Sequence, residues 1–204
     1  MFHLMPPLRL HYPFAGRWLV RNSPADRVPS HGTALFGLSH AVDFVPVDDG
    51  GRSGPYTLTS FFRPEAPAAF PGFGRPVLAP AGGVVISVHG SAPDHDSYRG
   101  LPSVGYALTQ RRRLNSGWLA VIGNHVLIEV TTRPEAGSPA GRTAVVVLCH
   151  LQQGSITVRV GQQVSPGEVV GRCGNSGNST EPHLHLHAVD GPDLLHAKAV
   201  PITF

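Results

Sequence analysis

The chain is poor in most of the groups that would point directly to a function. Charged residues make up 14% of its 204 residues, and a net charge of +3 is too weak a field to indicate a nucleic-acid partner. Two cysteines, Cys149 and Cys173, are too few for a disulfide framework, and whether they pair is left open. No apolar run approaches the roughly 20 residues that span a bilayer, so no membrane insertion is expected.

The N-terminal residues MFHLMPPLRLHYPF contain neither an apolar core nor the small-residue cleavage site of a signal peptide. This favours a cytoplasmic protein by default, or an extracytoplasmic one if a leader was removed or export is non-standard. Lys198 is the single lysine among sixteen basic residues, a bias typical of a GC-rich bacterial genome. The oligomeric state is left unknown.

With 24 glycines and 20 prolines, the sequence has room for many short strands but few long helices. The only fair helix candidate is Ser103–Leu114. Since strands follow one another without alternating helices, we predict an all-β protein with an antiparallel sheet. The predicted strands are Ala41–Val47, Val84–His89, Ala120–Val130, Thr143–Leu151, Ser155–Val160, Val169–Cys173 and His183–Val189.

We expect a single domain over residues 1–204. Its N-terminal arm, residues 1–29, reads as irregular, and residues 49–74 and 90–117 read as long loop insertions. The strand patterns on either side of these insertions are too short to build separate cores, so neither insertion is interpreted as a linker between domains.

Twelve histidines are the unusual feature of the composition, and the densest cluster is His183-Leu-His185-Leu-His187. On a strand, alternate side chains share a face, so the three imidazoles would point one way and the leucines into the core. Two histidines at this spacing can converge on a metal ion. We interpret the cluster as part of a metal site rather than as a polar surface.

Two further residues fit such a site. His150 follows the apolar run Val145–Cys149, where a strand would meet a pocket or a turn. Asp43 lies inside an apolar strand, where a carboxylate is costly to bury unless it is paired or binds a metal. A carboxylate together with several imidazoles is the ligand set of a catalytic zinc ion.

The run Val145–Val189 resembles the lysostaphin-type (LytM-like) zinc metallopeptidases. It contains a His-Leu after a strand, a G-x-x-V-x-x-G hairpin, the loop G-N-S-G-N-S and then P-H-L-H. Upstream, R-P-V-L-A-P-A-G-G-V-V and G-N-H-V-L-I are similar to two further family motifs, so the resemblance covers roughly residues 31–190. It implies the family's fold, an antiparallel sheet built on a duplicated hybrid motif.

The resemblance also implies roles for individual residues. Asp43 and His185 correspond to zinc ligands, and His183 and His150 to the two catalytic histidines. The family's third ligand is a histidine four residues before the aspartate, but Ser39 stands there in this chain. His40 should face the other way on a regular strand, whereas His31 in a turn-like segment could fold back over the sheet. We favour His31 over His40.

These residues predict a zinc-dependent endopeptidase that acts on peptides, with peptidoglycan stem peptides or cross-bridges as the substrate the resemblance suggests. The alternative is a non-catalytic family member that activates or binds cell-wall hydrolases. A lipoyl or biotinyl carrier role is disfavoured because Lys198 lies outside the hairpin. A phosphohistidine role would require that His150 or His183 accept phosphate.

Overall fold

The computed structural model describes residues 6–109, 113, 117–132 and 141–204. Its helices are η1 (Leu35–His40), α1 (Leu58–Phe62), η2 (Pro67–Ala69), α2 (Leu101–Leu108) and α4 (Trp118–Ile122). Its strands are β1 (Leu8–Arg9), β2 (Trp18–Arg21), β3 (Val42–Pro46), β4 (Pro76–Leu78), β5 (Gly83–His89), β6 (His125–Thr131), β7 (Thr143–Cys149), β8 (Gln163–Val164), β9 (Val169–Arg172), β10 (Leu184–Val189), β11 (Ala199–Val200) and β12 (Ile202–Thr203).

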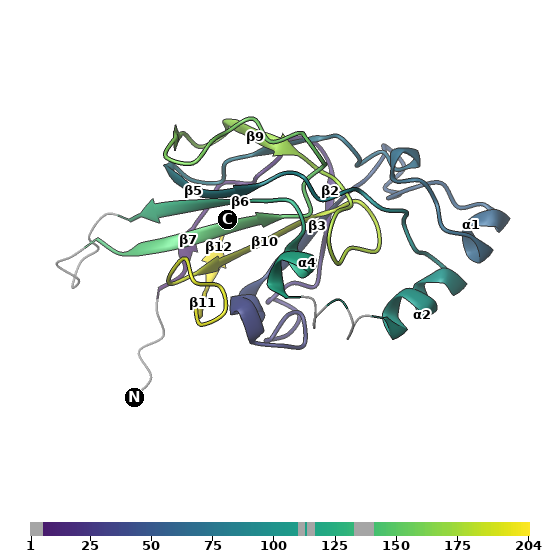
Figure 1. The fold of residues 1–204 in the computed structure, drawn as a ribbon, viewed down its shortest axis with the longest axis horizontal. Helices are drawn as coiled ribbons and strands as arrows, with labels where there is room; N and C mark the ends of the chain where they lie inside the picture. Colours follow the sequence, from purple (N-terminus) through teal and green to yellow (C-terminus); the bar gives the residue numbers. More distant parts are fainter. Residues whose placement is uncertain (1–5, 110–112, 114–116, 133–140) are drawn as a thin grey trace.

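One antiparallel sheet organises the described residues (Figure 1). Its strands follow the order β2-β3-β10-β7-β6-β5-β8, and β11 also pairs with β10. Two smaller pairs, β1 with β12 and β4 with β9, complete the strand pairing. The prediction of an all-β, antiparallel fold with few helices is therefore confirmed.

Both faces of the central strands are covered. Along β7, Val146 and Leu148 belong to the main hydrophobic core, whereas Val145 and Val147 belong to a second cluster on the opposite face. The second cluster includes Ile122 of α4. Burial on both faces explains why the sequence of β7 is a continuous apolar run rather than an alternating one.

The cysteines follow the same division. Cys149 packs in the second cluster and Cys173 in the main core, and both are free thiols. Burial raises the pKa of each thiol well above its usual range, so both stay protonated at neutral pH.

Two predicted strands differ from the structure. Residues Ala120–Val130 divide into the end of α4 and most of β6, because Gly123 takes a left-handed conformation (φ 62°) that ends the helix. Residues Ser155–Val160 form no named strand, although the Thr157 amide donates to the Val170 carbonyl and Val158 is buried. Apolar and polar residues alternate here as in a strand, but the segment has isolated hydrogen bonds to β9 instead of a strand ladder.

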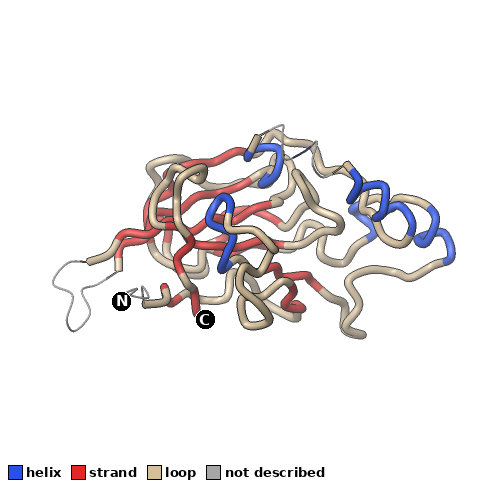
Figure 2. Tube along the Cα trace, turned by 90° about the horizontal axis from the view of Figure 1, so that it is seen from below, coloured by secondary structure: helices blue, strands red, loops and turns tan. Residues whose placement is uncertain are grey.

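The segments expected to be irregular carry some regular structure. Residues 18–21 of the N-terminal arm form β2, which extends the main sheet beside β3. The helices α1 and α2 lie in the two long insertions and project from one end of the sheet (Figures 1 and 2). The predicted helix Ser103–Leu114 corresponds in part to α2, and its residues 110–112 and 114 lie outside the described part.

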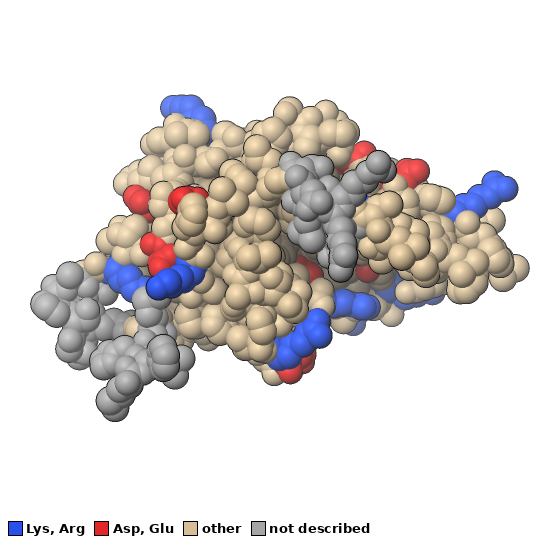
Figure 3. Space-filling view, turned by 60° about the horizontal axis from the view of Figure 1, so that its bottom comes forward, with Lys and Arg blue, Asp and Glu red and all other residues tan. Residues whose placement is uncertain are grey.

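The two insertions are joined by a half-buried ion pair. Arg99 Nη2 lies 2.7 Å from Glu65 Oε2, and an isolated β-bridge links Glu65 to Ser97. On the face seen in Figure 3, acidic and basic side chains are scattered rather than gathered into one patch. Within the described part of the chain, no helix is both long and apolar enough to cross a membrane.

The segment before β3 is fixed by close packing at Gly37. This residue is buried with φ 72°, and a Cβ atom there would overlap the Val189 side chain. Phe36 beside it is also left-handed, with φ 57°. The segment therefore passes over β10 at a point where only a glycine fits.

We expect Gly37→Ala to destabilise the fold more than Gly16→Ala. Both glycines have positive φ, which costs an alanine about 1–2 kcal/mol, but a Cβ at Gly16 has nothing within 4 Å. Overlap with Val189 adds about 1–3 kcal/mol at Gly37. Chemical unfolding of both variants measures the difference, and equal losses would contradict this packing.

Candidate metal centre

Two neighbouring strands bring the central residues of the site together. In the pairing of β3 with β10, Asp43 stands opposite His185, and on the other side of β10 His185 stands opposite Cys149 of β7. Leu184 and Leu186 point into the main core, as the alternation predicted. The register of three strands thus fixes where the imidazole of His185 lies.

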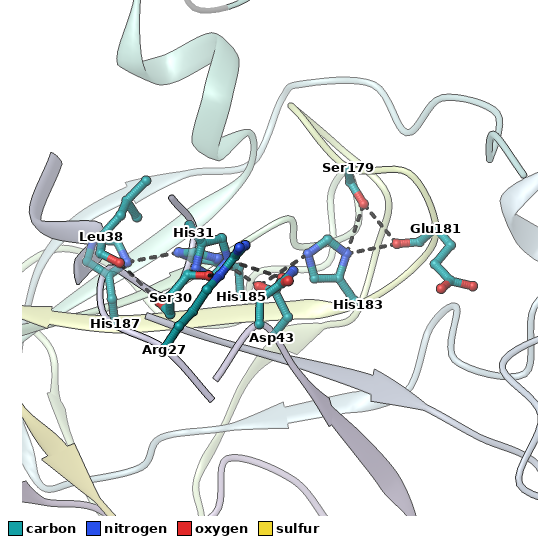
Figure 4. A network of polar contacts seen from close by, with 11 residues as sticks. Arg27, Ser30, His31, Leu38, Asp43, Ser179, Glu181, His183, His185 and His187 are labelled. Carbon is teal, nitrogen blue, oxygen red and sulfur yellow. Dashed lines mark hydrogen bonds and ion pairs between the residues drawn. The ribbon is translucent and has the colours of Figure 1, made fainter. Parts of the chain in front are cut away.

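The Asp43 carboxylate is the hub of the polar contacts in Figure 4. Its Oδ1 lies 2.8 Å from His185 Nδ1, and its Oδ2 lies 3.1 Å from His31 Nε2. Asn22 Nδ2 donates to Oδ2 at 2.7 Å. His183 Nε2 lies 3.6 Å from Oδ1. Asp43 is only 6% exposed, so this carboxylate is buried among imidazoles.

Burial by itself would raise the pKa of Asp43. The opposing effects are the charge of His183 and the hydrogen bonds with His185 and His31, and together they hold the pKa well below its usual range. The carboxylate is therefore ionised at neutral pH and attracts a positive charge into the site.

His31 reaches this carboxylate from the turn-like segment before η1. Ser30 Oγ donates to the Leu38 carbonyl at 3.2 Å and lies 3.0 Å from His31 Nδ1. With Nδ1 of His31 donating to Ser30 Oγ, Nε2 would present a lone pair to the carboxylate 3.1 Å away, and a bound cation would take the place of the hydrogen bond between them.

His185 has a partner on its other nitrogen. Its Nε2 lies 3.2 Å from Nδ1 of His187, which is 1% exposed. Burial lowers the pKa of His187 well below its usual range, and the nearby His185 and His31 lower it further. Burial also lowers the pKa of His185, although the contact with Asp43 opposes this. Both rings are therefore neutral at pH 7, the form that binds metals.

Two groups of donor atoms have the spacing of a metal site within the described residues. The donor atoms within each group lie within 4.8 Å of one another. One group consists of His31, Asp43 and His185, and the other of Cys149, His185 and His187. Cysteine binds metal as a thiolate, and the raised pKa of Cys149 disfavours that form. The group with the ionised Asp43 is the better cation site.

His150 and His183 lie beside this group with their protons fixed by backbone carbonyls. His150 Nδ1 donates to the Ser176 carbonyl at 2.8 Å, and His183 Nδ1 donates to the Glu181 carbonyl at 2.8 Å. Their ring centroids are 4.7 Å apart. Nε2 is thus the nitrogen that each ring has available for exchanging a proton. Burial, with the nearby His183 and His185, lowers the pKa of His150 well below its usual range.

The five residues selected from the sequence as site residues lie in one cluster: His31, Asp43, His150, His183 and His185. His40, the alternative to His31, ends η1 and belongs to neither donor group. Sequence reasoning missed Asn22 and Ser30, whose side chains hold Asp43 and His31. Neither residue stands in a motif: the contact of Asn22 with Asp43 spans 21 residues, and Ser30 directly precedes His31 without any recognisable pattern.

Residues 114–193 match the family model of peptidase family M23. The matched segment contains His150, His183 and His185, whereas His31 and Asp43 precede it. Among curated proteins, no match to the chain was found.

Solved structures similar to the chain include M23 peptidases. The catalytic domain of lysostaphin from Staphylococcus simulans is 17% identical, with 82% of this chain and 80% of that chain covered and a TM-score of 0.40. A mutant catalytic domain of the prophage-encoded M23 protein EnpA from Enterococcus faecalis is 19% identical, with coverages of 98% and 92% and a TM-score of 0.42. A putative glycyl-glycine endopeptidase from Ruminococcus gnavus is 16% identical, with coverages of 97% and 56% and a TM-score of 0.44.

We expect Ser30→Ala to weaken metal binding by about 10- to 100-fold, the usual effect of removing a group that orients a ligating histidine. The alanine variant loses the hydroxyl that contacts Nδ1 of His31 and orients the ring. Metal affinity is measured by competition with a chromophoric chelator. Ser39→Ala is the matched control, since the Ser39 side chain has no hydrogen bond among the described residues. Equal affinities of the two variants would contradict the role of Ser30.

Proposed function

We propose that the chain is a zinc-dependent endopeptidase that uses His31, Asp43 and His185 as metal ligands. The observation that carries the proposal is the convergence of imidazole nitrogens on an ionised, buried carboxylate. Two imidazoles and one carboxylate suit zinc and leave a coordination position open. Bound zinc would polarise a peptide carbonyl and lower the pKa of water to about 7.

His150 and His183 would supply the proton transfers. Each has its Nδ1 proton held by a carbonyl, so each presents Nε2 to the reacting groups. A neutral imidazole can accept a proton from water and return it to the departing amine. Because burial keeps His150 neutral at pH 7, that ring begins the cycle as a base. His183 lies between His150 and Asp43, with its Nε2 3.6 Å from Asp43 Oδ1.

The substrate we propose is a peptide, and the resemblance to lysostaphin-type sequences extends this to the stem peptides or cross-bridges of peptidoglycan. Family M23 supports peptide hydrolysis as the class of reaction. The test is the release of new amino groups from cell walls and from peptides containing glycine and alanine. No release by zinc-loaded protein would favour the alternative, a non-catalytic partner of cell-wall hydrolases.

Elemental analysis tests the proposed ligands. We expect about one zinc ion per chain in the wild type, and its loss in His31→Ala and His185→Ala, because two remaining ligands hold zinc poorly. His40→Ala is the matched control and should retain the metal. Loss of zinc in His40→Ala with retention in His31→Ala would reverse the choice between these two histidines.

Substitutions of the two other histidines separate catalysis from metal binding. We expect His150→Ala and His183→Ala to retain zinc but to lose about 10²- to 10⁴-fold in kcat, the usual contribution of a positioned acid or base. His196→Ala removes an exposed imidazole that contacts Asp193 and should match the wild type. Wild-type rates in the first two variants would exclude the proton-transfer role.

A further inference from the structure

An apolar cavity opens directly beside the imidazole cluster. Its volume is about 340 Å³, and His31, His150 and His185 contribute to its lining. The same three residues line a second cavity of about 240 Å³, which also contains Asp43 and Arg113. The candidate metal centre therefore lies between two cavities of different character.

The walls of the first cavity come from two segments on either side of the site. Phe36 and Leu38 of η1 form one wall, and Val121 and Ile122 of α4 form the other. None of its lining residues within the described part of the chain is an aspartate, glutamate, lysine or arginine. A charged side chain that entered this cavity would lose its hydrating water without gaining an oppositely charged partner. An apolar side chain would lose no such hydration.

The cavity is large enough for a substantial side chain. A closed apolar cavity of about 150 Å³ already admits benzene, and this one has about 340 Å³. Leucine and phenylalanine side chains both fit such a space. A glycine or alanine residue would leave most of it unfilled.

Both walls are anchored. Gly37 packs closely against Val189 of β10, which fixes the wall formed by η1. On the other side, the carbonyl of Val121 accepts a hydrogen bond from the Asn178 amide at 2.9 Å, which ties α4 to the loop before β10. Because the walls are already in place, binding does not require them to be ordered first.

We propose that this cavity is a specificity pocket for one leucine- to phenylalanine-sized apolar side chain of the peptide substrate, on a residue flanking the cleaved bond. Because the cavity adjoins the metal centre, its occupant would lie next to the cleaved bond. The size of the cavity and the lack of charged residues in its lining favour an apolar side chain. The inference rests on the proposed peptidase function but departs from its extension to peptidoglycan, since a glycine or alanine residue would leave most of the cavity unfilled.

Kinetics on a peptide series tests the preference. The peptides are pentaglycine and its variants in which one position at a time is replaced by alanine, leucine or phenylalanine. We expect kcat/KM to be at least about tenfold higher for leucine or phenylalanine than for glycine at one position beside the cleaved bond. The highest kcat/KM for glycine or alanine at every position would overturn the proposal.

Val121→Phe should fill the pocket and abolish this preference, with glycine cleaved as before. Leu119→Phe is the matched control on the same short helix, because Leu119 is 47% exposed and does not line the cavity. Val121→Ala enlarges the pocket without adding bulk and should shift the preference from leucine toward phenylalanine. An unchanged preference in both Val121 variants would contradict the location of the pocket.

Binding measurements separate failure of the pocket from failure of the peptidase function. N-acetyl-leucinamide added to the full chain should shift the NMR signals of residues around Val121, and N-acetylglycinamide should not. Val121→Phe should remove the effect, and Leu119→Phe should keep it. Binding without cleavage of any peptide would refute the proposed function but support the pocket. Equal shifts with both amides would refute the pocket even in an active enzyme.

Discussion

The pairing of β3 with β10 places a carboxylate opposite an imidazole in the interior of the protein, and the rest of the site depends on this pair. Burying the Asp43 carboxylate is costly unless positive or hydrogen-bonding groups surround it. His185, His31 and Asn22 provide those groups within 3.1 Å. A slip of one residue in the register would turn Asp43 to the other face of the sheet and leave it unpaired.

Backbone carbonyls and one serine determine which nitrogen of each ring is available. The carbonyls of Ser176 and Glu181 take the Nδ1 protons of His150 and His183, and the Ser30 hydroxyl lies 3.0 Å from Nδ1 of His31. These acceptors belong to loops whose positions are set by the surrounding sheet. The site is therefore organised by main-chain geometry as much as by its side chains, and a substituted loop could disturb the chemistry without touching a histidine.

Much of the fold could be predicted from the sequence, because buried strands such as β7 and β10 carry uninterrupted apolar or alternating patterns. The prediction erred where the pattern is ambiguous. Residues 118–122 are apolar enough for a strand, but the left-handed Gly123 ends them as a short helix. Residues 155–160 alternate apolar and polar side chains but form no strand ladder, and pairing with a neighbouring strand is not visible in composition. The strand β2 was missed because only its pairing with β3 makes it regular.

The sequence by itself determined the histidine pattern, the carboxylate in an apolar strand and the apolar runs that form the sheet. Those features follow from local chemistry and strand periodicity. Only the tertiary structure brought His31, rather than His40, beside Asp43, because Ser30 and the close packing at Gly37 direct the segment before β3. The apolar cavity is likewise a tertiary feature, since its walls come from segments more than 80 residues apart that meet only when the sheet has formed.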